Sequence, residues 1–158
     1  MSLVYLGLGS NIGDRRVMID RAIECLSEKI GSILRGGTYE SKDFGGTDQD
    51  VYMNTAIQGQ TALTPQELLI CVKEIESNLG RIHRYHWGPR EIDIDILLYD
   101  DCVVNDHNLT IPHAGMHERD VVLAPLIDIN PSLIHPVFNK TVKEFFDQLP
   151  LSKRFIIL

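Results

Sequence analysis

The chain has 158 residues, 44% of them hydrophobic, and a formal net charge of −7. That length suits a single domain over residues 1–158, which can bury a core without disulfides or a structural metal. The acidic balance argues against a general nucleic-acid binder and against a membrane-surface protein, because both classes carry a basic face.

Apolar runs and capping residues predict strands and helices in the first half of the chain. Strands are expected over residues 3–8, 32–39 and 51–60. Asp14 is a suitable N-cap for a first helix, and Thr64-Pro65 with Glu67 form the N-cap, first-turn proline and capping box of a second. Both helices have apolar residues at helical spacing: Ile19, Ile23, Leu26 and Ile30 in the first, and Leu68, Val72, Ile75 and Leu79 in the second.

The second half continues with one strong strand signal and several weaker signals. Gly80 ends the second helix, and a strand within residues 92–98 is followed by a turn at residues 100–101. Helices are expected over residues 117–127 and 140–149, and an edge strand over residues 154–158. Hairpin-sized gaps between the second and third strands indicate an antiparallel or mixed sheet that carries helices, which is an α+β fold.

Two aspartates alternate with apolar residues in the strand expected at residues 92–98. Asp93 and Asp95 share one face, and the other face is apolar: Ile92, Ile94, Ile96 and Leu98. Like charges on one face repel each other and aspartate has a low strand propensity, so a bound cation would relieve both costs. At a rise of about 3.3 Å per residue the two side chains start roughly 6 to 7 Å apart. Converging carboxylates at that separation can bridge two divalent cations.

A basic segment precedes this strand. Gly80 and Gly88-Pro89 mark residues 81–90 as a loop. It contains three arginines, two histidines and the chain's only tryptophan: Arg81, His83, Arg84, His86, Trp87 and Arg90. Mg²⁺ held by carboxylates and substrate phosphates, with arginines on the remaining phosphate oxygens, is the usual set for phosphoryl transfer. The loop and the strand together predict an enzyme that acts on a phosphate-bearing substrate.

The same segment carries a resemblance to a known family. Gly80-Arg81, Arg84, Trp87-Gly88-Pro89-Arg90 and the Asp93-x-Asp95 strand are similar to the signature of the 6-hydroxymethyl-7,8-dihydropterin pyrophosphokinases. Other family blocks follow in order, so that the resemblance covers nearly the whole chain: Gly9-Ser10-Asn11, Thr47-Asp48-Gln49, Tyr52-Met53-Asn54, Ile111-Pro112-His113 and His117-Glu118-Arg119. The resemblance implies a ferredoxin-like three-layer αβα sandwich with a mixed, mainly antiparallel sheet. It also implies transfer of pyrophosphate from ATP to a pterin alcohol, with release of AMP, in folate biosynthesis.

The resemblance further implies roles for individual residues. Asp93 and Asp95 would hold two Mg²⁺ ions, while Arg81 and Arg90 would contact the phosphates or position the pterin alcohol. ATP would be bound from several segments, by Lys73, Glu76, Arg84, Trp87, Ile96, Thr110, His113 and Arg119. The pterin would be bound by Ser41, Phe44, Tyr52, Asn54, Trp87 and Val121, with Trp87 as a lid over the ligands. Without the resemblance, Glu76 is interpreted as a solvated helical charge and His113 as a core histidine.

Departures from the family lie on the substrate side. Ser41-Lys42 stands where many members have Thr-Pro, Ala114 where some have a polar or aromatic residue, and Val121 where a phenylalanine commonly completes the pterin sandwich. A pyrophosphokinase that acts on another alcohol therefore stays an alternative. A ferredoxin-like nucleotide- or metal-binding module without turnover is a second alternative, which the retained arginines and aspartates disfavour.

Cysteine usage and hydropathy give an expected compartment. Cys25, Cys71 and Cys102 are odd in number and widely spaced, so neither a disulfide framework nor a zinc site is expected. The first residues lack the features of a signal peptide, and no run reaches membrane-spanning length. We expect a cytoplasmic monomer whose partners are ATP and the pterin, without nucleic acid or membrane.

Overall fold

The computed structural model describes residues 1–42, 51–81 and 91–157. Four residues with predicted roles, Phe44, Arg84, Trp87 and Arg90, lie outside the described residues. Their predicted contacts with ATP and the pterin stay predictions.

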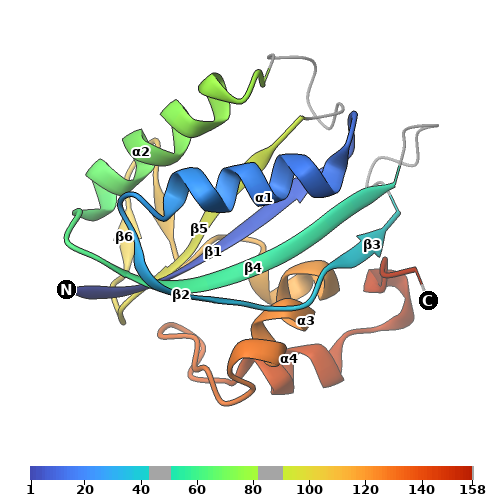
Figure 1. Ribbon diagram of the computed structural model, residues 1–158. Helices are drawn as coiled ribbons and strands as arrows, with labels where there is room; N and C mark the ends of the chain where they lie inside the picture. The colour runs from blue at the N-terminus through green and yellow to red at the C-terminus, as the bar shows by residue number, and fades with distance from the viewer. Residues whose placement is uncertain (43–50, 82–90, 158) are drawn as a thin grey trace.

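A five-stranded sheet forms the middle of the molecule (Figure 1). Its strands are β1 (Ser2–Ser10), β2 (Gly31–Arg35), β3 (Tyr39–Ser41), β4 (Tyr52–Thr61) and β5 (Asp93–Tyr99). The order is β2-β4-β1-β5, and β3 also pairs with β4. All of these pairings are antiparallel, which confirms the α+β class and the mainly antiparallel sheet. Strand β5, which carries the two aspartates, lies at one edge.

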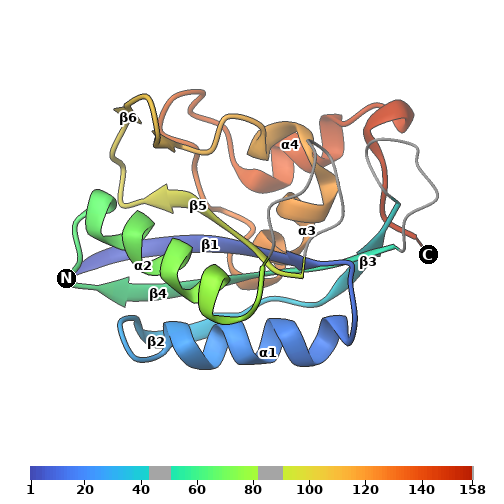
Figure 2. The ribbon, with the colours of Figure 1, turned by 90° about the horizontal axis from the view of Figure 1, so that it is seen from above.

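Two layers of helices cover the two faces of the sheet. Helices α1 (Arg15–Leu26) and α2 (Pro65–Asn78) pack on one face, and α3 (Asp120–Ile129) and α4 (Val142–Gln148) pack on the other (Figure 2). The arrangement is the three-layer αβα sandwich that the family resemblance implied. The predicted caps are confirmed: the Asp14 side chain accepts from Val17 N, and Thr64 forms a capping box with Glu67.

Shorter elements connect the strand of the two aspartates to α3. Strands β6 (Val104–Asn105) and β7 (Thr110–Ile111) form a hairpin, and the 3-10 helix η1 (Met116–Glu118) follows. A second 3-10 helix, η2 (Leu151–Lys153), precedes the C-terminal segment. None of the helices in the described part of the chain is long and apolar enough to cross a membrane.

The second predicted strand is in fact two strands. β2 ends at Arg35, and β3 begins at Tyr39. Between them the chain passes close to α3, where a β-carbon on Gly36 would lie 2.2 Å from the Pro125 carbonyl oxygen. Gly36 N still donates to Ala56 O at 2.9 Å, so the chain stays beside β4 without continuing the ladder.

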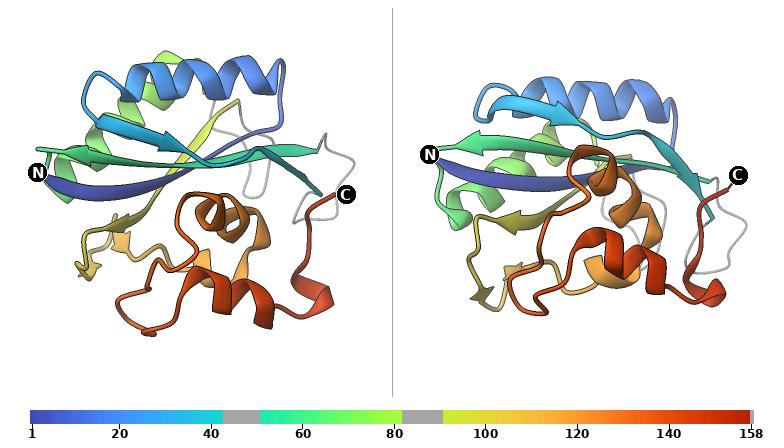
Figure 3. Two further views of the ribbon diagram at one scale, coloured as in Figure 1. Left: turned by 60° about the horizontal axis from the view of Figure 1, so that its bottom comes forward. Right: turned by 90° about the horizontal axis from the view of Figure 1, so that it is seen from below.

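The predicted C-terminal elements are shorter than expected. The helix predicted over residues 117–127 is divided at Arg119 into η1 and α3, and the helix predicted over residues 140–149 covers only Val142–Gln148. The predicted edge strand at residues 154–158 is a single bridge between Ile156 and Ser41. This bridge nevertheless places the C-terminal segment beside β3, at the edge of the sheet (Figure 3).

A β-bulge breaks the predicted alternation of the aspartate strand. The register of β5 against β1 shifts between Ile96 and Leu98, which leaves Leu97 as an extra residue. Leu98 therefore packs with Leu97 in the core beneath α3 and α4, and its predicted place beside Ile92 was wrong. Tyr99 takes that place in the core beneath α1 and α2.

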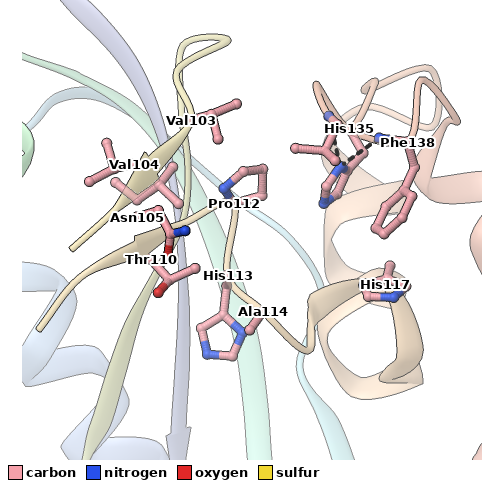
Figure 4. Close-up of a pocket in the computed structure, with 12 residues that line it drawn as sticks. Val103, Val104, Asn105, Thr110, Pro112, His113, Ala114, His117, His135 and Phe138 are labelled. Atoms are coloured by element: carbon pink, nitrogen blue, oxygen red, sulfur yellow. Dashed lines mark hydrogen bonds between the residues drawn. The ribbon is translucent and has the colours of Figure 1, made fainter. Parts of the chain in front are cut away.

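A buried histidine sits in the loop between α3 and α4. His135 is 3% exposed, and its Nδ1 accepts from Val137 N at 3.2 Å and from Phe138 N at 3.3 Å (Figure 4). An Nδ1 that accepts hydrogen bonds must be unprotonated, so these contacts require a neutral ring. Burial lowers the pKa of His135, and the neighbouring His117 lowers it further.

The lowered pKa of His135 predicts that acid destabilises the protein. The folded state binds a proton on His135 less readily than the unfolded state does. The contribution of His135 to the free energy of unfolding is therefore fully present above the ordinary histidine pKa of about 6.5 and is lost as the pH falls below that value. Burial also lowers the pKa of His113, which acts in the same direction. The free energy of unfolding, measured with urea, should fall less between pH 7 and pH 5 in His135→Asn than in wild type. His107→Asn, which changes an exposed histidine, should keep the wild-type loss; an unchanged loss in His135→Asn would contradict the assignment.

Candidate active site

Asp93 and Asp95 lie on one face of β5, as the alternation predicts. In the register against β1, Asp93 is opposite Gly9 and Asp95 is opposite Gly7. The side chains are 23% and 37% exposed, so both carboxylates are accessible from outside. The opposite face of β5 is buried in the core beneath α1 and α2. The strand therefore presents two neighbouring carboxylates at the edge of the sheet.

A buried carboxylate holds the edge of β5. Glu76, near the end of α2, is 3% exposed, and its Oε2 accepts from Ile94 N at 2.8 Å. The same oxygen accepts from Arg81 Nη1 at 2.5 Å, and that nitrogen also donates to Asp93 Oδ1 at 3.1 Å. Lys73 Nζ lies 3.3 Å from Glu76 Oε1. Helix α2, Arg81 and the aspartate strand thus meet at one carboxyl group.

The interpretation of Glu76 as a solvated charge from the sequence alone was wrong. Glu76 follows Leu68 and Val72 at intervals of four residues, and all three are buried. A charge at this spacing lies on the apolar face of its helix. Glu76 can be buried there because the edge of β5 and Arg81 supply donors for its carboxylate. The spacing within the helix is the signal that could have predicted its burial.

His113 follows β7 and lies beside the second aspartate. His113 N donates to Leu97 O at 3.0 Å, which fixes the residue against β5. His113 Nε2 is 3.8 Å from Asp95 Oδ2, and Nδ1 accepts from Gly115 N at 3.2 Å. Burial lowers the pKa of His113 and the positive charge of Arg119 lowers it further, while Asp93 opposes the shift. A β-carbon on Gly115 would lie 3.2 Å from Arg119 Nε, so Arg119 folds against the turn after His113.

A cavity of about 330 Å³ adjoins Asp95, between α2 and the β6–β7 hairpin. It brings together five predicted site residues: Lys73, Asp95, Ile96, Thr110 and His113. His107 and Asn108, which the sequence did not single out, also line it. A second cavity of about 260 Å³ shares Thr110, His113 and Ala114 with the first and is bounded by His135 and Phe138 (Figure 4). Residues 110–114 therefore separate the two cavities.

Three residues predicted to bind the pterin come together on β3 and β4. Ser41 lies opposite Tyr52 in the sheet, and Asn54 Nδ2 donates to Ser41 Oγ at 2.9 Å and to Tyr39 O at 3.3 Å. Asn54 is also opposite Gly9 of β1, which in turn is opposite Asp93. Directly opposed residues point to the same face. Asn54 and Asp93 therefore flank Gly9 on one face of the sheet.

Val121 and the Gly9-Ser10-Asn11 segment complete the described surroundings. Val121 lies in the first turn of α3 and is 4% exposed; its predicted contact with the pterin stays a prediction. Ser10 is fully buried, and its Oγ donates to Glu91 O at 2.5 Å. This bond joins the end of β1 to the chain just before β5. The sequence motif identified the segment, but only the structure indicates what Ser10 does.

Comparison with known proteins identifies the family. A sequence model of 7,8-dihydro-6-hydroxymethylpterin-pyrophosphokinase (HPPK) matches residues 5–131, which include both aspartates, Arg81, His113 and Arg119. The chain belongs to the HPPK family. Two relatives named 2-amino-4-hydroxy-6-hydroxymethyldihydropteridine pyrophosphokinase match nearly all of the chain. The one from Aquifex aeolicus is 47% identical over 92% of this chain and 91% of its own length. The one from Methylorubrum extorquens is 42% identical over 94% of each chain.

Solved structures support the HPPK fold. The Plasmodium falciparum HPPK-DHPS structure with pterin and p-hydroxybenzoate superposes with a TM-score of 0.74 at 18% identity. The match covers 93% of this chain and 43% of the longer Plasmodium chain. The fold is ferredoxin-like, as the resemblance implied.

Proposed function

We propose that this member of the HPPK family transfers the pyrophosphoryl group of ATP to 6-hydroxymethyl-7,8-dihydropterin and releases AMP, a step of folate synthesis. The observation that carries this proposal is the identity of 47% with a named pyrophosphokinase along nearly the whole chain. The carboxylate pair of Asp93 and Asp95, of which Asp95 lines the cavity, supports it chemically. The hydroxymethyl oxygen attacks the β-phosphorus, and the bond from that phosphorus to the oxygen shared with the α-phosphorus breaks.

The two aspartates fit Mg²⁺. Within residues 1–42, 51–81 and 91–157 no group of three histidine, cysteine or carboxylate side chains is placed to hold a metal ion. A pair of accessible carboxylates suits Mg²⁺, which keeps several waters and is completed by substrate phosphates. Asp93 and Asp95 would hold two such ions. When bound, Mg²⁺ neutralises charge on the phosphate oxygens.

Basic side chains near the aspartates supply the rest of the charge stabilisation. Arg81 is permanently charged, and its contacts with Glu76 and Asp93 fix its guanidinium in advance of binding. His113, whose Nε2 lies 3.8 Å from Asp95 Oδ2, and Arg119 contact the ATP phosphates. Arg90 and Arg84, from the basic loop, act on the same phosphates. All of these groups stabilise charge that develops on the transferred group.

The remaining assignments divide between the two substrates. The cavity beside Asp95 takes the nucleoside of ATP, with Ile96 and Thr110 around the adenine and Lys73 at its rim. The pterin lies on the side of β3 and β4, against Tyr52 and Asn54. Other pterin contacts come from Ser41, Phe44 and Val121, and Trp87 closes over the ligands.

Pterin-dependent consumption of ATP tests the proposal. The protein with ATP and Mg²⁺ should consume ATP slowly or not at all, and addition of 6-hydroxymethyl-7,8-dihydropterin should start steady turnover. A second alcohol that gives faster turnover would favour a different acceptor. Tight binding of ATP and the pterin without turnover would instead favour a binding module, and either result would contradict the proposed reaction.

A further inference from the structure

Residues 155–157 lie along the outer edge of β3 (Figure 3). An antiparallel bridge pairs Ile156 with Ser41. Two backbone hydrogen bonds flank this bridge, at 3.0 and 2.8 Å: Lys42 N to Phe155 O, and Ile157 N to Glu40 O. Strand β3 has three residues and pairs with β4 along its other edge. This short strand is therefore held between β4 and residues 155–157.

A buried carboxylate of α3 binds the same segment. Asp120 lies in the first turn of α3 and is 2% exposed. Its Oδ2 accepts from Phe155 N at 2.8 Å and from Ile156 N at 2.9 Å. In a continued antiparallel ladder Phe155 N would donate to Lys42 O, because the two residues of a hydrogen-bonded pair exchange both bonds. Asp120 takes this donor instead, which explains why the predicted edge strand is reduced to a bridge.

Asp120 depends on residues 155 and 156 for its hydrogen bonds. A carboxylate that is buried this deeply needs donors to replace the water it has lost. Its second oxygen, Oδ1, is buried and has no hydrogen-bond partner within residues 1–42, 51–81 and 91–157. The two backbone amides on Oδ2 therefore supply the hydrogen bonds of this carboxylate in the described part of the chain. The carboxylate and the segment stabilise each other.

The two elements that are joined in this way both carry predicted acceptor contacts. Ser41, on β3, is fully buried and accepts from Asn54 Nδ2 at 2.9 Å. Val121 follows Asp120 directly in α3. The predicted nucleotide contacts that line the cavity beside Asp95 lie instead on α2, on β5, and in or just after the β6–β7 hairpin. The link through residues 155–157 therefore lies on the acceptor side of the proposed site.

We propose that Asp120 is a positioning residue for the acceptor and that it acts through residues 155–157. Its carboxylate fixes this segment, and the segment fixes β3 relative to the first turn of α3. Asp120 is too deeply buried to bind a substrate itself. The inference rests on the proposed function, because it takes Ser41 and Val121 as acceptor contacts. Loss of the link weakens acceptor binding more than it affects ATP binding or the chemical step.

Kinetics of Asp120 variants test this inference at a temperature where thermal melts show that each variant is folded. Asp120→Ala should raise KM for 6-hydroxymethyl-7,8-dihydropterin at least about fivefold, while kcat and KM for ATP stay within about twofold of wild type. A merely structural role would instead reduce the amount of active protein and leave KM unchanged. Asp120→Asn keeps an oxygen that can accept from both amides and should restore KM to within about twofold. The matched control is Asp147→Ala, which removes an exposed carboxylate paired with Lys143 on α4 and should behave as wild type.

A second variant breaks the link from the other side. Ile156→Pro removes one of the two amide donors and should also raise KM for the pterin. If Asp120 acts through the segment, the two effects should not add, and the double variant should have about the KM of the weaker single variant. Hydrogen exchange at the amides of Phe155 and Ile156 should be faster in Asp120→Ala than in wild type.

Three results would overturn the inference. They are a wild-type KM for the pterin in folded Asp120→Ala, an equal rise in KM for ATP, and fully additive effects in the double variant. If Asp120→Ala does not fold, Ile156→Pro decides alone, and a wild-type KM for the pterin in that variant would overturn the inference. Pterin-dependent turnover by the wild type is measured in parallel, because its absence would instead refute the proposed function.

Discussion

Replacement of Asp95 by asparagine should lower kcat by at least about a thousandfold while the fold stays intact. The change removes one of two proposed Mg²⁺ ligands, and metal ions supply several kcal/mol of charge stabilisation in such sites, at about 1.4 kcal/mol for each tenfold change in rate. The Asp95 side chain is 37% exposed, so the melting temperature should change by no more than about 2 °C. Initial rates and thermal melts of the same preparation provide both values.

Asp101→Asn is the matched control for this substitution. Asp101 is an exposed aspartate in the turn that follows β5, outside the proposed site, and its variant should keep wild-type turnover. Titration with Mg²⁺ gives a second measurement, because Asp95→Asn should need a higher Mg²⁺ concentration to bind an ATP analogue. Wild-type turnover and wild-type Mg²⁺ dependence in Asp95→Asn would remove Asp95 from the metal site.

The second large effect is expected at Glu76. Glu76→Ala leaves the buried Ile94 N–H without its acceptor and leaves the largely buried Arg81 paired with Asp93 in place of two carboxylates. Loss of one partner of a buried ion pair costs about 3 to 5 kcal/mol. For a chain of this size that loss lowers the melting temperature on the order of 10 °C. Turnover at a temperature where the variant is folded should also fall, because Glu76 positions Arg81 and the edge of β5 that carries Asp93.

Two further variants distinguish positioning from general destabilisation. Glu76→Gln keeps an oxygen that can accept from Ile94 N and should recover part of the stability, but it loses the ion pair with Arg81 and should stay impaired in kcat. Glu74→Ala removes an exposed carboxylate from the same helix and should resemble wild type in both measurements. A wild-type melting temperature in Glu76→Ala would contradict the stabilising role. Full turnover by folded Glu76→Ala would show that Glu76 does not position the site.

Features that depend on neighbours along the chain could be predicted from the sequence. The Asp14 cap, the capping box at Thr64 and the shared face of Asp93 and Asp95 each arise from spacing within one element, and the structure confirms all three. The break near Gly36 could not be predicted, because it depends on a contact with Pro125 in a different layer. The bulge at Leu97 could not be predicted either, since it is defined by the partner strand.

In the candidate site, too, features set by neighbours along the chain could be predicted, and features set by contacts between elements could not. The motif that contains Arg81, Asp93 and Asp95 is local, so residue types and spacing are enough to indicate its chemistry. The burial of Glu76 depends on the free edge of β5, and the placement of Gly9 between Asn54 and Asp93 depends on the register of three strands. Sequence spacing carries no information about register between strands that are tens of residues apart. The geometry of the acceptor side therefore had to come from the fold.

Identification of the nucleotide product tests the central claim most directly. Wild-type protein is incubated with ATP, Mg²⁺ and 6-hydroxymethyl-7,8-dihydropterin, and the products are followed by phosphorus NMR and separated by chromatography. Attack on the β-phosphorus must give AMP and the pterin diphosphate ester in equal amounts, and neither product should form when the pterin is left out. Formation of ADP with a pterin monophosphate, or of AMP at the same rate without the pterin, would contradict pyrophosphoryl transfer at this site.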